Sequence, residues 1–258
     1  MAPWRPAIAW VWVASLLVLI GAGLAHGPAS GLRGALAVFL AWAITRELAP
    51  RRALAAAAAP VAAVAFAIPG DTDLLACFGV LLVARIAARS VGDPPTWLDL
   101  AALLGLSWWL ALRAEGLPVA LVLAAIIAAD SPPRRARIAG VAALLVVLLT
   151  GALEGTLTAR PRWDDPSMAS QALLLVAAAA SIWLVLAPLP ARLRVRDDRK
   201  RGGLRGPRLR SARVAVLACV LATIAWTGTD GAFALSCACA ALLVSGLLSA
   251  RARPEVAS

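Results

Sequence analysis

The charged residues of this chain fall into short clusters between apolar stretches, and the clusters alternate between arginine-rich and acidic or neutral. Because Lys and Arg are retained on the cytoplasmic side of membrane proteins, this alternation predicts a chain that crosses a membrane repeatedly. With ten apolar segments and the N-terminus inside, all but four of the 25 Lys and Arg residues lie in inside clusters. The four exceptions are Arg33, Arg113, Arg160 and Arg162.

Composition agrees with this placement. The chain has 258 residues, of which 62% are hydrophobic, and a mean hydropathy of +0.84. That is too much apolar surface for one soluble core, and no long polar stretch is present to form a second domain. We therefore expect residues 1–258 to form a single polytopic membrane domain. The net charge of +11 is accounted for by the inside loops, so we expect membrane lipids as partners and no nucleic acid.

The predicted fold is an all-α integral membrane bundle of about ten transmembrane helices, with both termini in the cytoplasm. We expect Ala- and Gly-rich faces to hold these helices together by close packing. The candidate spans cover residues 7–25, 32–48, 53–69, 73–89, 97–112, 116–130, 136–153, 168–188, 212–227 and 231–250.

Two alternatives change the number of spans. The two segments within residues 97–130 are short for a hydrocarbon core of about 30 Å, and a re-entrant hairpin there would leave eight spans. The first segment has a basic residue, Arg5, before it and small residues after it, as a cleavable signal peptide has. Its length and three tryptophans favour a retained span.

A basic loop is predicted at residues 190–213. From Arg192 to Arg213 it carries ten basic residues and two acidic ones, with several glycines that make it flexible. Such a loop lies on an anionic inner leaflet, because each basic residue near the surface contributes about 1 kcal/mol to lipid association. The residues predicted to contact lipid headgroups are Arg199, Lys200, Arg201 and Arg205.

The candidate site consists of ionisable residues near the ends of predicted spans, because a charge at depth is costly unless it is paired or hydrated. Arg85 lies about one turn inside the cytoplasmic interface, and Arg89 lies one turn further on the same face. Two like charges at this spacing favour an anion between them, which is either a protein carboxylate or a ligand phosphate. The other candidates at the same side are Arg46, Glu47 and Asp99.

Structural roles compete with this anion-binding hypothesis. Arg85 and Arg89 are also placed to extend their side chains to lipid headgroups. Asp99 stands three residues after Thr96, which is the spacing of a capping box at a helix start.

Sequence motifs exclude several enzyme classes. We find no P-loop, no Gly-x-Ser-x-Gly nucleophile turn, no histidine-glutamate metal helix and no Asp-rich diphosphate motif. The segment from Arg85 to Asp99 also departs from the phosphatidyltransferase signature, since no Asp-Gly precedes it. The four cysteines lie in apolar segments at no recognisable metal spacing. We predict no metal and no cofactor, and the catalytic residues, if the protein is an enzyme, are undetermined.

Three functions remain open. The first is a transporter or permease for a small or lipid-linked molecule in a bacterial inner (plasma) membrane, because many-span chains without a soluble domain are often carriers. The second is a membrane-embedded enzyme or binder of a phosphorylated lipid at the cytoplasmic face, based on the candidate arginines and carboxylates. The third is a non-catalytic subunit with a membrane protein partner, favoured by the small number of polar residues inside the spans.

Overall fold

The computed structural model describes residues 5–50, 52–67, 72–88, 96–130, 134–158, 168–187, 192–193 and 204–251. These residues form eleven α-helices, one 3-10 turn (η1) and one pair of two-residue strands. The helices are α1 (Arg5–His26), α2 (Pro28–Leu48), α3 (Ala53–Ala67), α4 (Leu74–Ala88), α5 (Trp97–Ala111), α6 (Leu117–Asp130), α7 (Arg134–Leu153), α8 (Met168–Leu186), α9 (Gly206–Thr227), α10 (Thr229–Ala234) and α11 (Ser236–Arg251), with η1 at Thr156–Thr158.

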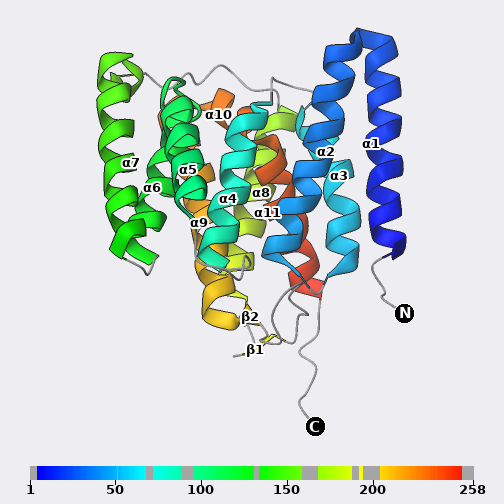
Figure 1. Cartoon of the computed structure of the whole chain (residues 1–258). Coiled ribbons are helices and arrows are strands. Elements are labelled where there is room, and N and C mark those ends of the chain that lie inside the picture. The colour runs from blue at the N-terminus through cyan, green and yellow to red at the C-terminus, as the bar shows by residue number, and fades with distance from the viewer. Residues whose placement is uncertain are drawn as a thin grey trace.

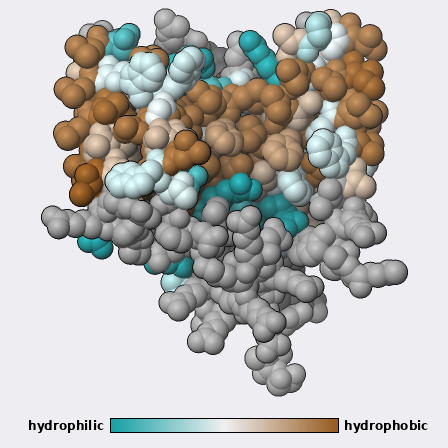
Figure 2. Space-filling view, in the orientation of Figure 1, coloured by the Kyte–Doolittle hydropathy of each residue, from teal (hydrophilic) through white to brown (hydrophobic). Residues whose placement is uncertain are grey.

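The predicted helical class is confirmed for the described residues, and the length and apolarity of the helices support the membrane prediction in part. Three described segments, Pro28–Leu48, Ala136–Leu153 and Gly206–Thr227, are long and apolar enough to cross a membrane. Seven further apolar segments have 10–17 residues. Hydrophobic side chains form a band across the face seen in Figure 2. These features are compatible with a membrane protein, while the count of ten spans is not established by length.

The helices form a bundle whose long axes run in roughly the same direction (Figure 1). In it, α11 packs against α2, α3 and α8, whereas α4 packs against α2, α6 and α9. Helix α1 lies at one edge against α2, and α7 lies at the other edge against α5 and α6. Helix α1 begins and α11 ends at the same end of the bundle (Figure 1).

Close helix packing rests on small residues, as the sequence predicted. A Cβ on Gly140 of α7 would clash with the backbone of Ala128 in α6. A Cβ on Gly246 of α11 would clash with the carbonyl of Ala180 in α8. Since only hydrogen fits at these two crossings, the neighbouring backbones approach closely enough for dispersion contacts to stabilise the bundle.

Two predicted boundaries are wrong. The segment predicted as the tenth span is interrupted at Leu235, which separates α10 from α11. Helix α9 starts at Gly206 and not at residue 212, so the last part of the predicted basic loop is helical. Near the other end of that loop, β1 (Arg192–Leu193) pairs antiparallel with β2 (Leu204–Arg205), so its two sides are joined by a short ladder that the sequence did not predict.

Candidate functional site

One end of the bundle gathers most of the described arginines that have polar partners. It consists of the last turns of α2, α4, α8 and α11 together with the first turns of α3 and α9, and we call it the arginine-rich end. It is also the end at which α1 begins (Figure 1). Each of these last turns presents backbone carbonyls without a partner in the next helical turn, and therefore carries partial negative charge.

An ion pair joins two of the predicted site residues there. Arg85 Nε, in the last turn of α4, donates to Glu47 Oε1, near the end of α2, at 3.0 Å. The Glu47 side chain is 15% exposed and that of Arg85 is 44% exposed. Glu47 therefore orients the Arg85 guanidinium, while the two terminal nitrogens have no hydrogen-bond partner among the described residues.

Arg46 lies beside this pair on α2. Its guanidinium carbon lies 5.7 Å from the centroid of the Trp42 ring, one helical turn back. This cation–π geometry holds Arg46 against the helix surface. The structure thus brings Arg46, Glu47 and Arg85 to one end of neighbouring helices.

Two further arginines bind helix C-termini at this end, and the sequence did not single them out. Arg213 is 4% exposed and donates from Nε to the carbonyl of Leu48 at 3.1 Å and from Nη1 to the carbonyl of Leu184 at 2.9 Å. Arg52 donates from Nη1 to the carbonyl of Leu248. These two cations thereby bind carbonyls in the last turns of α2, α8 and α11, where positive charge is favoured.

Partial burial has an electrostatic consequence for Arg52. It lowers the pKa of the Arg52 guanidinium below its ordinary value, because the charged form loses solvation. The charges of Arg52 and Arg210 both act on Arg213. The arginine-rich end therefore holds several like charges within interaction range of one another.

The position of Arg213 follows from the helical period. The buried side of α9 includes Leu209, Ala212, Val216 and Val220, and Arg213 falls within the same stripe. Counting Arg213 among flexible loop charges was therefore wrong. The sequence did contain a signal for this position. Arg213 directly follows Ala212 and stands three residues before Val216, so an arginine there lies on the apolar side of a helix.

Asp99 has a local role and is not bonded to Arg85. It forms a capping box with Thr96: the Thr96 side chain accepts from the Asp99 backbone, and the Asp99 side chain accepts from the Thr96 backbone at 2.8 Å. Both residues are exposed at the start of α5. The capping role predicted for Asp99 is confirmed.

Several predicted site residues lie outside the described part of the chain. They are Arg89, Arg199, Lys200 and Arg201. Arg205 is described only as part of the backbone of β2.

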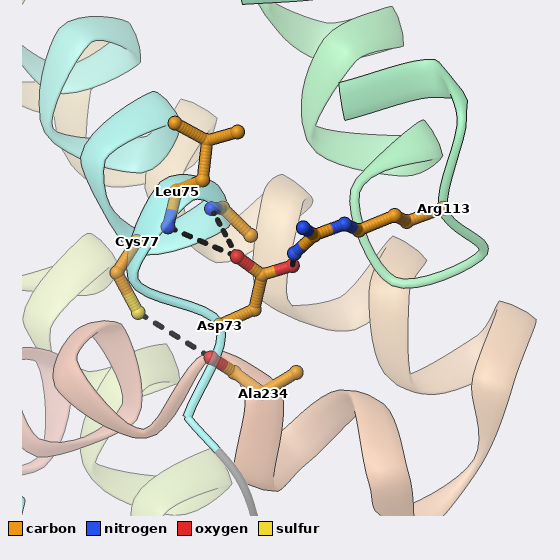
Figure 3. Close-up of polar contacts among 6 residues, drawn as sticks. Asp73, Leu75, Cys77, Arg113 and Ala234 are labelled. Atoms are coloured by element: carbon orange, nitrogen blue, oxygen red, sulfur yellow. Dashed lines mark hydrogen bonds and ion pairs between the residues drawn. The ribbon is translucent and has the colours of Figure 1, made fainter. Parts of the chain in front are cut away.

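The opposite end of the bundle holds a second ion pair (Figure 3). Arg113 Nη1, between α5 and α6, donates to Asp73 Oδ2 at 3.2 Å, and Asp73 Oδ1 accepts from the backbone nitrogens of Leu75 and Ala76 in α4. The interruption after α10 leaves the Ala234 carbonyl to accept from the Asp73 backbone and from Cys77 Sγ. This cluster joins α4, α10 and the α5–α6 turn, and its bonds are those of a structural cap.

Neither the cysteines nor the comparisons with known proteins identify a functional site. Cys77, Cys219, Cys237 and Cys239 are buried and free. Within the described ranges, no three His, Cys, Asp or Glu side chains are grouped closely enough to hold a metal ion. Comparison with protein-family models, with curated proteins and with solved structures finds no match.

Proposed function

We propose that this chain is a multi-pass protein of the cell membrane whose arginine-rich end faces the cytoplasm and binds a phosphorylated lipid. The orientation rests on the alternation of charge along the sequence, which assigns the basic clusters to the inside. It agrees with the placement of the start of α1 and the end of α11 at one end of the bundle (Figure 1). We retain ten crossings in this proposal, with α10 and α11 together forming the last one.

Short helices are compatible with that count. Helices α4 and α5 have 15 residues each, which gives about 22 Å at the helical rise of about 1.5 Å per residue. A bilayer adapts to spans shorter than its core of about 30 Å by local thinning and by extension of flanking side chains. The exposed tryptophans Trp97, Trp108 and Trp109 at the two ends of α5 fit an interfacial position.

The observation that carries the lipid-binding proposal is the Glu47–Arg85 pair. The carboxylate holds Nε of the guanidinium, and the terminal nitrogens, on a side chain that is nearly half exposed, make no hydrogen bond with a described residue. This planar fork suits the oxygens of a phosphate. Arg46 lies beside the pair, and Arg52 and Arg213 add positive charge at the same end. Since Arg52 and Arg213 bind backbone carbonyls, which carry no net charge, their positive charge adds to a local field that favours an anion.

Binding is favoured over transport because five buried hydroxyls form hydrogen bonds within their own helices. Thr45, Ser107, Ser181, Thr227 and Ser249 each donate to the carbonyl four residues earlier in their own helix. These five hydroxyls therefore have no donor left for a substrate, and among the described buried hydroxyls those of Thr223 and Ser245 make no hydrogen bond. The transporter and the partner-subunit hypotheses stay predictions.

Lipid binding to Arg85→Gln protein tests the proposal. Native mass spectrometry of the detergent-solubilised protein measures the affinity for phosphatidic acid relative to phosphatidylcholine. We expect Arg85→Gln to weaken phosphatidic acid binding by about tenfold or more, since one hydrogen bond to a charged group is worth about 1.5–3 kcal/mol. Arg137→Gln, which removes an exposed arginine from the first turn of α7, is the matched control.

Glu47→Gln separates binding from a purely structural ion pair. It keeps an acceptor for Arg85 Nε and removes a negative charge, so phosphatidic acid should bind as well as to the wild type, or more tightly. Wild-type affinity in Arg85→Gln, or an equal loss in Arg137→Gln, would contradict the proposal.

A further inference from the structure

A groove runs between α6 and α9 from the arginine-rich end toward the middle of the bundle. Its walls are residues 122–129 of α6 and residues 206–218 of α9, and its volume is about 780 Å³. This is within the range of about 300–1,000 Å³ typical of small-molecule pockets. Along α9 the groove extends about 18 Å at the helical rise of about 1.5 Å per residue.

Small side chains make the groove hollow. Ala125 and Ala129 stand one turn apart on α6, and Ala215 and Ala218 line the facing side of α9. Ala125, Ala129 and Ala218 are exposed, so each presents a methyl group where a larger side chain would fill the space. The deeper walls are therefore apolar and suit a hydrocarbon chain.

Charge is confined to one end of this groove. Arg210 and Ser211, in the second turn of α9, line it near the start of that helix. Ser211 Oγ donates to the Pro207 carbonyl at 3.1 Å, whereas exposed Arg210 makes no hydrogen bond or ion pair with any described residue. The charge of Arg210 acts on buried Arg213, and Arg52 adds a like charge there. An anion at Arg210 would relieve this repulsion.

We propose that the α6–α9 groove binds one anionic phospholipid, with an acyl chain along the apolar walls and the phosphate on Arg210. The length of about 18 Å matches one leaflet, since the whole hydrocarbon core is about 30 Å thick. An apolar groove with a cation at its interfacial end is complementary to a lipid with an anionic head. It is a poorer match for an apolar helix of a second copy of this chain, because such a helix offers Arg210 no anion.

This site stands apart from the one at Arg85. It is built from α6 and α9, whereas Glu47 and Arg85 belong to α2 and α4. Loss of the Arg85 site would leave the groove intact, and the converse also holds.

Photo-crosslinking in phosphatidylcholine nanodiscs tests the proposal. The probes are phosphatidic acid and phosphatidylcholine that carry the same diazirine-labelled acyl chain, and mass spectrometry locates the labelled peptides. In the wild type we expect crosslinks in residues 122–129 and 206–218 at about fivefold higher yield for phosphatidic acid, the factor that one arginine near an anionic headgroup supplies.

Matched variants separate the contribution of the lipid phosphate from that of the acyl chain. Arg210→Gln should bring the two yields to parity, while Arg137→Gln and Arg85→Gln should leave the fivefold ratio unchanged. Ala218→Trp should fill the groove and remove crosslinks from both probes. Ile138→Trp, at an exposed position of α7, should leave them in place.

Three results would overturn the proposal. Equal yields for the two probes in the wild type would show that the groove takes bulk lipid without selection. A crosslinking yield that stays about fivefold higher for phosphatidic acid in Arg210→Gln would show that Arg210 does not bind the phosphate. Absence of groove crosslinks, together with disulfide formation between copies in Ala218→Cys, would assign the groove to a second copy of the chain.

Discussion

Replacing Arg213 by methionine should destabilise the bundle by removing the link between α2, α8 and α9. Methionine fills much of the same space with apolar atoms, but the carbonyls of Leu48 and Leu184 lose their donor. Two hydrogen bonds from a cation are worth about 1.5–3 kcal/mol each, or about 3–6 kcal/mol together. In the membrane position proposed for α9, removing the arginine also relieves a desolvation cost of up to about 2.5–3.5 kcal/mol. The difference is a net loss of about 0.5–2.5 kcal/mol.

Unfolding by sodium dodecyl sulfate in mixed micelles, followed by circular dichroism, measures this change. Arg213→Lys keeps the charge but replaces the two-armed fork by a single ammonium, so we expect a smaller loss than for methionine. Arg137→Met is the control, because this exposed arginine makes no hydrogen bond or ion pair with a described residue, and surface changes of this kind alter stability by less than about 0.5 kcal/mol. Equal stability of Arg213→Met and the wild type, or an equal loss in Arg137→Met, would refute the capping role of Arg213.

Two further changes test the packing and the basic loop. Gly246→Ala should lower the free energy of unfolding by about 1–3 kcal/mol, because its methyl group meets the Ala180 carbonyl. Gly105→Ala in α5 should be neutral or stabilising, since no atom lies within 4 Å of the added Cβ and alanine has the higher helix propensity; an equal loss in both variants would show that Gly246 is not a special contact. Removing four basic loop charges should leave membrane insertion intact, because the other inside clusters still set the orientation, and cell fractionation measures this. The same change should weaken binding to anionic vesicles, which flotation measures. Loss of folded protein would instead show that the loop makes specific structural contacts. The four substitutions are Arg199, Lys200, Arg201 and Arg205 to Gln.

The sequence predicted helical class and most boundaries because both depend on local information. Apolar runs and the charge clusters between them place the ends of α3 to α8 within about two residues of the observed ends, as expected for strongly apolar segments. The capping box at Thr96 and Asp99 is equally local. It needs only a four-residue spacing, which a linear sequence shows directly.

Contacts between distant segments could not be predicted in the same way. Arg85 and Glu47 are 38 positions apart, and which of the nearby carboxylates would pair with Arg85 depended on the packing of α2 against α4. Arg213 was misassigned because its charge suggested a loop, whereas its position on the apolar stripe of α9 decides its burial. The break at Leu235 depends on a tertiary contact. It frees the Ala234 carbonyl to accept hydrogen bonds from the backbone of Asp73 and from Cys77 Sγ at the start of α4.

Sidedness tests the central claim most directly, because every lipid contact proposed here requires the arginine-rich end to face the cytoplasm. In a cysteine-free background, single cysteines at Glu154, exposed after α7, and at Gly203, in the predicted basic loop, are treated in intact cells with a membrane-impermeant thiol reagent. The account predicts labelling at Glu154→Cys and protection at Gly203→Cys until the cells are permeabilised. Labelling at Gly203→Cys in intact cells, with protection at Glu154→Cys, would contradict it.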